Sequence, residues 1–275
     1  MAQDYTVSQE KFEIWECQNC QLRFTQHIPG ESEIGRYYQS EEYISHSNTS
    51  KGLVNTLYQW VRNYTLGQKR KLIEKLSGRK SGSLLDIGCG TGEFLGTMKE
   101  AGWKSTGLEP DEGARQQAKA QGVEVHPSEH LFQLNGSYDV ITMWHVLEHV
   151  HRLHEYLDQI ESILADDGLL IIAVPNYNSR DASHYQAEWA AYDVPRHLYH
   201  FEAEAMERLL GQHGFRLEKL QHMPFDGFYV SLLSEKYRHG KSRLVPAFVQ
   251  GLRSYLLSSS RHEKGSSIMY MIRKA

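Results

Sequence analysis

Residues 84–95 read LLDIGCGTGEFL, and this stretch decides the fold. Its apolar start predicts a short buried strand, its glycines at alternate positions (Gly88, Gly90 and Gly92) predict a tight turn, and the residues from Glu93 onward predict a helix. Glycine keeps the backbone clear of side chains where the strand turns into the helix. A ligand can therefore lie against the main chain, close to the N–H groups that begin the helix.

Apolar runs and amphipathic segments alternate on both sides of this turn. Short, continuously apolar strands separated by helices indicate a parallel sheet covered by helices on both faces. Ligands of such sheets bind at the carboxyl ends of the strands, so the residues directly after each strand are the candidates for chemistry. The expected strands cover 84–87, 103–108, 123–125, 138–143, 169–174, 215–220 and 268–272, and the expected helices cover 53–76, 93–101, 111–121, 153–164 and 203–211.

The composition limits the classes of protein to which the chain can belong. Of its 275 residues 40% are hydrophobic and 23% are charged, which excludes extensive disorder. The net charge of -4 argues against general affinity for nucleic acid, and no apolar run reaches the ~20 residues of a membrane span. Three cysteines are too few for a disulfide scaffold, and the N-terminus lacks the pattern of a secretory signal. We therefore expect a cytoplasmic protein without a membrane or nucleic-acid partner.

Glu109 follows the second expected strand, about 20 residues past the glycine turn, where a carboxylate grips the hydroxyls of a ribose. The alternative is an exposed loop acid, but its occurrence together with the glycine turn favours ribose binding. The glycine spacing is G-x-G-x-G, whereas dinucleotide-binding proteins carry G-x-G-x-x-G. An NAD-dependent oxidoreductase is therefore the less favoured alternative.

The stretch WHVLEH, residues 144–149, follows the fourth expected strand. It matches the H-x-x-E-H pattern of zinc proteases, which we reject because the motif follows a sheet strand directly and no third ligand is evident. In the other interpretation Glu148 and His149 begin a helix, whose dipole favours Glu148, and His149 makes a local hydrogen bond. A metal role of another kind stays open.

Segment 177–201 follows the fifth expected strand and is expected to form a long loop over the site, too polar to belong to the core. Loops longer than ~12–15 residues are often lids or binding loops. We expect His197, oriented by Asp193, to act as a general base near neutral pH, and Arg196 to hold an anionic group of the substrate. A surface loop with polar decoration is the alternative.

Cys17 and Cys20 form a C-x-x-C pair near the start of the chain. A closed structural zinc site needs four ligands, so this pair is only half of a zinc ribbon. His27 and His46 could complete it, but their spacing is irregular. A free, reduced pair is the favoured interpretation.

Four motifs in this order resemble class I S-adenosylmethionine-dependent methyltransferases: LLDIGCGTGEFL, TGLEPD, YDVITMWHVLEHV and LADDGLLIIAVPN. The stretch YDVPRHLYHF, followed by a helix and Gly-Phe, resembles the bacterial subgroup that includes methyltransferase-domain type 23 and 12 proteins. The resemblance covers about residues 53–223.

This resemblance implies an α/β fold with a doubly wound, seven-stranded, mostly parallel sheet of the Rossmann-like methyltransferase type. The last strand, near 268–272, would lie antiparallel between strands five and six. Residues 1–52 would form an N-terminal cap with an incomplete zinc-ribbon-like pair, and 53–275 the methyltransferase domain, with a helical insertion at 224–266.

The resemblance also implies a cofactor site for S-adenosylmethionine, which leaves as S-adenosylhomocysteine. Tyr38, Tyr43 and His46 would fold over this site as a cap. The implied cofactor contacts are Asp86, Gly88, Cys89, Gly90 and Gly92 to the methionine portion, Glu109 to the ribose, Pro110 and Ser128 to the adenine, and Met143, Trp144 and His145 beneath the sulfonium.

Related quinone O-methyltransferases carry E-x-x-E-H at the position of WHVLEH and are thought to use a divalent cation. His145 replaces the first acid here, while Glu148 and His149 remain, so the resemblance leaves a divalent metal open without supporting it. The implied reaction is methyl transfer to an oxygen or nitrogen atom of a small-molecule acceptor, with His197 or His149 as base. A non-catalytic cofactor-binding protein or zinc-ribbon adaptor is the alternative, and the oligomeric state stays open.

Overall fold

The structure is a computed structural model that describes residues 1–39 and 53–275, with side chains from Arg62 onward in the second range. Tyr43 and His46, expected in the cap, lie outside the described residues.

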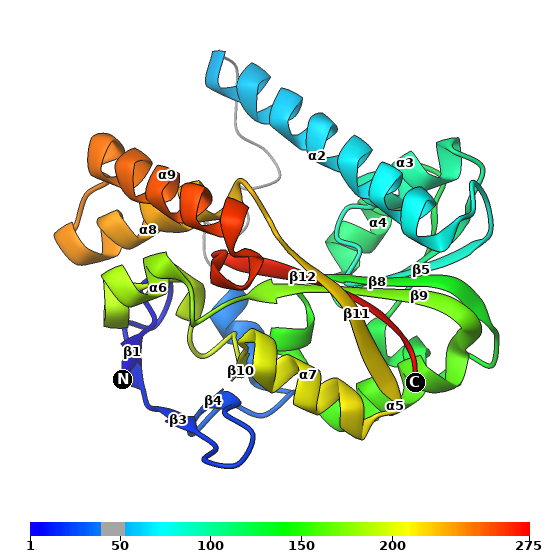
Figure 1. Ribbon diagram of the computed structural model, residues 1–275, viewed down its shortest axis with the longest axis horizontal. Helices are drawn as coiled ribbons and strands as arrows, with labels where there is room; N and C mark the ends of the chain where they lie inside the picture. The colour runs from blue at the N-terminus through cyan, green and yellow to red at the C-terminus, as the bar shows by residue number, and fades with distance from the viewer. Residues whose placement is uncertain (40–52) are drawn as a thin grey trace.

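The centre of the molecule is a seven-stranded sheet with the order β11-β12-β9-β8-β5-β6-β7 (Figure 1). Neighbouring strands from β9 to β7 run parallel, whereas β12 runs antiparallel to both β9 and β11. The predicted sheet and the predicted place of its last strand are therefore confirmed. The strands are β5 (Ser83–Ile87), β6 (Lys104–Leu108), β7 (Glu124–His126), β8 (Tyr138–Trp144), β9 (Leu164–Pro175), β11 (Phe215–His222) and β12 (Ser267–Lys274).

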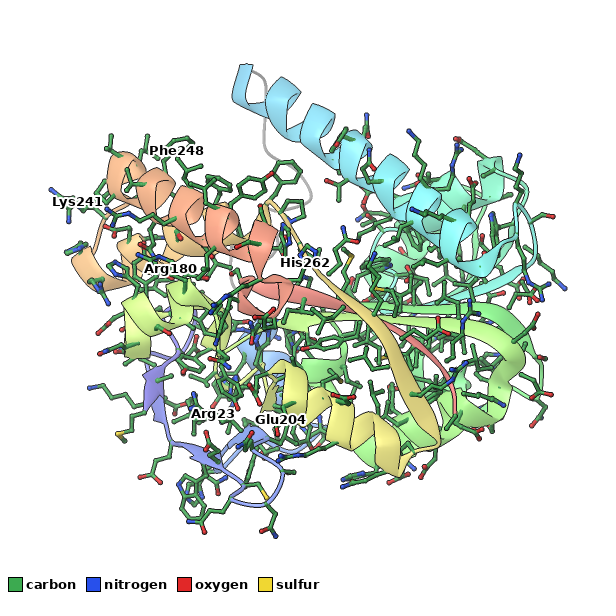
Figure 2. All side chains as sticks on the ribbon, in the orientation of Figure 1. Arg23, Arg180, Glu204, Lys241, Phe248 and His262 are labelled. Atoms are coloured by element: carbon green, nitrogen blue, oxygen red, sulfur yellow. The ribbon has the colours of Figure 1, made fainter. Side chains whose placement is uncertain are left out.

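Helices cover both faces of the sheet. Successive side chains of a buried strand point to opposite faces, so each strand contributes apolar residues to both layers. Leu85 and Ile87 of β5 face a core built with α5 (Leu153–Ile163) and α7 (Ala203–Gln212). Leu84 faces a second core. That second core includes residues of α2 (Leu53–Ser77), α3 (Glu93–Glu100) and α4 (Glu112–Ala120). Side chains fill both layers (Figure 2).

The N-terminal residues form small sheets at one end of the molecule. β1 (Ala2–Gln3) pairs with β2 (Lys11–Phe12), and β3 (Ile14–Glu16) pairs with β4 (Arg23–Thr25). β4 also pairs with β10 (Tyr199–His200), which belongs to the segment after β9. This pairing fastens the start of the chain to the segment that carries His197.

Segment 177–201 is not the polar loop that the sequence predicts. It contains α6 (Arg180–Tyr185), short 3-10 turns at Gln186–Glu188 and Ala190–Tyr192, and β10. Tyr185 and Trp189 are almost completely buried in a core of their own. The prediction is wrong because the aromatic residues are scattered among polar ones, so no periodic pattern marks the segment as core.

The predicted helical insertion is a hairpin of α8 (Asp226–His239) and α9 (Leu244–Ser260), which packs beside α6. Among the helices that the structure describes, none combines the length and the apolar character needed to cross a bilayer.

Candidate functional site

The glycine turn lies at the carboxyl end of β5 and adopts a left-handed backbone at all three glycines, with φ of 73° at Gly88, 53° at Gly90 and 86° at Gly92. A Cβ atom on Gly88 would lie 2.3 Å from Val146, and one on Gly92 would lie 2.8 Å from Ala118. A Cβ atom on Gly90 would have no described neighbour within 4 Å. Gly88 and Gly92 therefore serve packing, while Gly90 faces open space that a ligand can enter.

The carboxylate of Glu109 is tied to the same turn. It accepts hydrogen bonds from the backbone N–H groups of Gly90 and Asp111, each at 2.9 Å. Burial raises the pKa of Glu109, although these two N–H groups act in the opposite direction. Glu109 is 8% exposed, so the alternative of an exposed loop acid is wrong. Pro110 is exposed beside it, and Ser128 begins a 3-10 turn directly after β7 at the same sheet edge.

Asp86 is buried at the end of β5 and accepts a 2.6 Å hydrogen bond from Thr142 of β8. Burial raises the pKa of Asp86 to about 7, against the effects of that hydrogen bond and of Lys69. Burial also lowers the pKa of Lys69, on α2, to about 8. The Lys69 ammonium lies 3.8 Å from the ring centroid of Trp144, a cation–π distance. Sequence reasoning missed Lys69, because nothing in an amphipathic helix shows which lysine points at the site.

The indole N–H of Trp144 is buried and has no hydrogen-bond partner among the described residues. Phe94 packs against the ring edge-on. Met143 is completely buried and Cys89 is 8% exposed. Neither side chain therefore offers much surface to a ligand. Trp144, the last residue of β8, therefore carries one polar group that a ligand could satisfy.

His145 links β8 to the insertion. Its Nδ1 lies 3.3 Å from Glu148 and its Nε2 lies 3.1 Å from Asp226, the first residue of α8. Burial acts to lower the pKa of His145, but Asp226 and then Glu148 raise it to about 10. At neutral pH His145 is therefore an imidazolium between two carboxylates. Asp226 was not a candidate in the sequence, since it lies 81 positions away from His145.

Glu148 is completely buried, and apart from the ion pair with His145 neither of its oxygens has a hydrogen-bond partner among the described residues. Burial acts to raise the pKa of Glu148, but His145 lowers it below its usual value. A buried carboxylate with open lone pairs is costly unless a cation or a donor completes it.

Two imidazoles lie beside Glu148. Nδ1 of His149 lies 2.9 Å from the carbonyl oxygen of Arg196, and Nδ1 of His197 lies 2.9 Å from that of Ala191. A carbonyl only accepts, so we assign the proton to Nδ1 in both rings, which leaves a lone pair on each Nε2. The rings meet edge to face with centroids 4.5 Å apart. Burial and then His197 lower the pKa of His149 to about 4, so His149 is neutral at physiological pH.

Glu148, His149 and His197 offer ligand atoms that all lie within 4.8 Å of one another. Within residues 1–39 and 53–275 this is the one group of three or more metal-ligating side chains so arranged. Imidazoles whose Nδ1–H is held by a carbonyl are the usual ligand arrangement for divalent metals. The group therefore fits either a metal ion or a shared proton.

The N-terminal cysteines lie apart from this group. Cys17 and Cys20 are half-buried and unbonded to each other, in the loop between β3 and β4. Hydrogen bonds from the backbone of Cys20 and Asn19 lower the pKa of the Cys17 thiol. No third metal-ligating side chain joins them in the described part of the chain.

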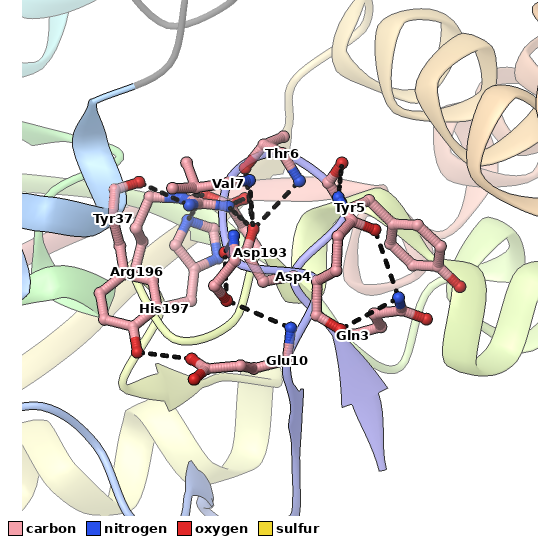
Figure 3. A network of polar contacts seen from close by, with 12 residues as sticks. Gln3, Asp4, Tyr5, Thr6, Val7, Glu10, Tyr37, Asp193, Arg196 and His197 are labelled. Carbon is pink, nitrogen blue, oxygen red and sulfur yellow. Dashed lines mark hydrogen bonds and ion pairs between the residues drawn. The ribbon is translucent and has the colours of Figure 1, made fainter.

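Arg196 does not fit its expected role of holding an anionic acceptor. Its guanidinium donates to both oxygens of Asp193 at 2.6 and 3.0 Å, to the Tyr37 carbonyl at 2.7 Å and to Asp4 at 3.1 Å (Figure 3). Only 1% of the residue is exposed. Arg196 is therefore a structural clamp between the N-terminus and the His197 segment.

His197 is likewise only 8% exposed, so the prediction that its segment is too polar for the core is wrong, and so is the alternative of a surface loop. The Asp193 carboxylate lies 3.9 Å from its Nε2, too far for a hydrogen bond, and the Ala191 carbonyl orients the ring in its place. The structure nevertheless brings His197 beside His149, as part of the group that follows β8.

Comparisons with known proteins agree with this geometry. Residues 61–220 match a family described as a methyltransferase domain. The ubiquinone biosynthesis O-methyltransferase of Glaesserella parasuis serovar 5 is 30% identical over 147 residues, 47% of this chain and 61% of that protein. The one from Aeromonas salmonicida is 33% identical over 118 residues, 40% of this chain and 50% of that protein. The matches thus span about half to three-fifths of these relatives.

Solved structures show the same fold. A SAM-dependent methyltransferase from Archaeoglobus fulgidus has a TM-score of 0.54 at 24% identity, covering 78% of this chain and 94% of that one. The magnesium protoporphyrin IX methyltransferase of Synechocystis, solved with bound SAH, has a TM-score of 0.56 at 15% identity, covering 87% and 97%.

Proposed function

Because the chain belongs to the methyltransferase-domain family, we propose that it transfers a methyl group from S-adenosylmethionine to a hydroxyl of a small-molecule acceptor. The observation that carries the proposal is the open space above Gly90, at the carboxyl end of β5, with Glu109 fixed beside it. The names of the curated relatives, which are O-methyltransferases, support oxygen over nitrogen as the acceptor atom.

The cofactor would lie along the carboxyl ends of β5, β6 and β7. Its methionine portion would lie against the main chain at Gly90, and its ribose hydroxyls would donate to Glu109. Its adenine would lie between Pro110 and Ser128, which flank the ends of β6 and β7. Trp144, whose buried N–H has no described partner, ends β8 and would lie beside the sulfonium.

Methyl transfer from a sulfonium needs little more than in-line positioning and a place for the acceptor proton. The acceptor oxygen forms the new C–O bond, the C–S pair returns to sulfur, and the proton of the hydroxyl must leave. The neutral Nε2 of His149 suits that proton, because the ring is half-buried and therefore reachable. The Glu148 carboxylate beside it would stabilise the imidazolium that forms.

Alternatively, the same group would hold the divalent cation that the resemblance to quinone O-methyltransferases leaves open, and His149 would then be a ligand in place of a base. One ligand atom each from Glu148, His149 and His197 lies within 4.8 Å of the others, and apart from its ion pair with His145 the Glu148 carboxylate has no described partner, so the group fits such an ion. A bound cation supplies Lewis-acid polarisation of an acceptor hydroxyl. Its ligands then position the acceptor, and His145 with Asp226 holds the neighbouring turn.

The class of acceptor and the cellular compartment are proposed from composition and charge. The net charge of -4 argues for a small molecule over nucleic acid as acceptor. The three cysteines are all free, which suits the reducing cytoplasm.

Gly90→Ala tests the cofactor site, with Gly78→Ala as its matched control. Both glycines have a left-handed backbone, with φ of 53° and 68°, and a Cβ atom on either would meet no described atom within 4 Å. Both variants should therefore lose the same ~1–2 kcal/mol of stability. Calorimetry with S-adenosylhomocysteine should show at least ~10-fold weaker binding for Gly90→Ala alone, equivalent to ~1.4 kcal/mol. Equal affinity in both variants would refute the site.

A further inference from the structure

The outward face of α9 is exposed and apolar. Leu244 and Val245 are 71% and 75% exposed, and Phe248 and Leu256 are each 60% exposed. Phe248 points outward from α9 in Figure 2. At about 100° per residue, these side chains form one stripe along the helix. The stripe consists of Leu244, Val245, Phe248, Val249, Leu252, Tyr255 and Leu256.

The stripe is held outward by tight packing on the opposite face. That face carries small residues, and a Cβ atom on Gly251 would lie 2.6 Å from Phe228 of α8. Ser254 donates a 2.9 Å hydrogen bond to the buried carboxylate of Asp181, which anchors α9 to α6. The helix therefore cannot turn its apolar side inward without losing these contacts.

The segment that carries the stripe has a positive net charge. Residues 240–262 include Lys241, Arg243, Arg253 and Arg261 and no Asp or Glu, although the chain as a whole has a net charge of -4. All four cationic residues are exposed, and Arg243 lies 3.8 Å from the Glu235 carboxylate of α8. Arg253 borders the stripe one turn from Val249, and Lys241 lies at the tip of the α8–α9 hairpin (Figure 2).

We propose that α9 binds the surface of an anionic lipid membrane, lying in the interface with its apolar stripe among the acyl chains. A helix with an apolar face and a basic border is the form of such interfacial helices, and anionic headgroups attract each nearby cation. At 17 residues α9 is about 25 Å long and is packed along its inner side, so it lies on the membrane without crossing it.

Charge complementarity favours lipid over a second copy of the chain. A contact between two α9 helices would bring the same four cations of each copy together, and among the described residues only Arg243 has an acid beside it, Glu235 at 3.8 Å. Anionic lipid supplies the missing negative charge. The proposal goes beyond methyl transfer, although α8 begins at Asp226 beside His145 and so connects this surface to the candidate site.

Vesicle co-sedimentation tests the proposal on the full chain. We expect binding to vesicles of equal parts phosphatidylcholine and phosphatidylglycerol that is at least ~10-fold stronger than to phosphatidylcholine alone. Binding should weaken in high salt, because salt screens the attraction between exposed charges. Failure of the wild-type chain to prefer anionic vesicles overturns the proposal, whatever the variants do.

The double variant Phe248→Ser with Leu256→Ser should lower the vesicle partition coefficient at least ~10-fold. Trp15→Ser is the control, because Trp15 is 56% exposed on the distant β3–β4 hairpin and should leave binding unchanged. Sedimentation velocity tests the competing explanation, in which a second copy of the chain covers the stripe. A wild-type dimer that the double variant converts to monomer, without anionic vesicle binding, would show that α9 joins two copies and would overturn the proposal.

Discussion

Replacing Arg196 with methionine removes the charge at the centre of the clamp while keeping most of the side-chain volume. Asp193 loses both of its bonds to the guanidinium and Asp4 loses one. Asp4 keeps its hydrogen bonds from Thr6, Val7 and Ser8. The two carboxylates are therefore affected unequally, and Asp193 carries most of the loss.

The structure sets the size of the effect. Arg196 and the side chain of Asp4 are 1% and 0% exposed, whereas the side chain of Asp193 is 23% exposed and gains water when it is left alone. Removing one member of a buried ion pair costs ~3–5 kcal/mol. We expect Arg196→Met to lower the free energy of unfolding by ~3 kcal/mol, the lower end of this range, because water reaches the Asp193 carboxylate.

Urea unfolding at neutral pH measures this loss, with Arg208→Met as the matched control. Arg208 pairs with Glu204 on the exposed side of α7, so its removal should cost no more than ~1 kcal/mol. A double-mutant cycle with Asp4→Asn then isolates the coupling between Arg196 and Asp4.

Two results would refute this reasoning. A loss below ~1 kcal/mol for Arg196→Met would mean that the clamp contributes no more than a surface pair. A stable variant whose Michaelis constant for an anionic acceptor rises would restore the acceptor-binding role that the structure argues against.

Three further predictions concern the histidine group and the thiols. His149→Gln should lower methyl transfer by ~10²-fold and leave cofactor affinity unchanged; normal turnover would remove His149 as the base. The pKa of His149 is lowered to about 4, so the stability that its neutral form contributes is complete above pH ~6.5 and is lost as pH falls toward 4. Unfolding free energies of wild type and His149→Asn should therefore converge over that range, and a pH-independent difference would contradict the shift. Burial raises the pKa of Cys89, so a thiol reagent at pH ~8 should label Cys17 and Cys20 in the native protein, and Cys89 only after unfolding.

The sheet could be predicted from sequence because its strands are continuous apolar runs. Residues 169–174 are fully buried in the structure, and a continuous apolar run of this kind is typical of a parallel strand that is covered on both faces. The antiparallel place of β12 could not be derived in this way, since its apolar run is equally compatible with either direction. Only the family resemblance supplied it.

The site could be predicted only where a local motif marks it. The glycine turn and Glu109 are signalled by spacing within one strand–turn–helix unit. Lys69 and Asp226 were not predicted as site residues. They reach the site from α2 and from the insertion, and no local motif in those segments indicates a contact with Asp86 or His145.

Arg196 was misread for a related reason. A polar residue in a polar stretch looks exposed, and its buried partner Asp4 lies 192 positions away along the chain. His197 was predicted to lie in a loop over the site, too polar for the core, yet it is 8% exposed and lies beside Glu148 and His149. In both cases contacts between residues far apart in the sequence determine the burial of the side chain, and no local periodicity indicates those contacts.

The position of β12 fixes the order in which the nascent chain can complete its sheet. The pairings among β5, β6, β7, β8 and β9 involve no residue of β11 or β12, so these pairings and the glycine turn can form before residues 267–274 are synthesised. β11 pairs with β12 alone in the described chain, and β9 has β12 along its other edge. Until residues 267–274 are translated, the apolar edge of β9 therefore stays open, a surface that chaperones recognise and that other unfinished chains can join.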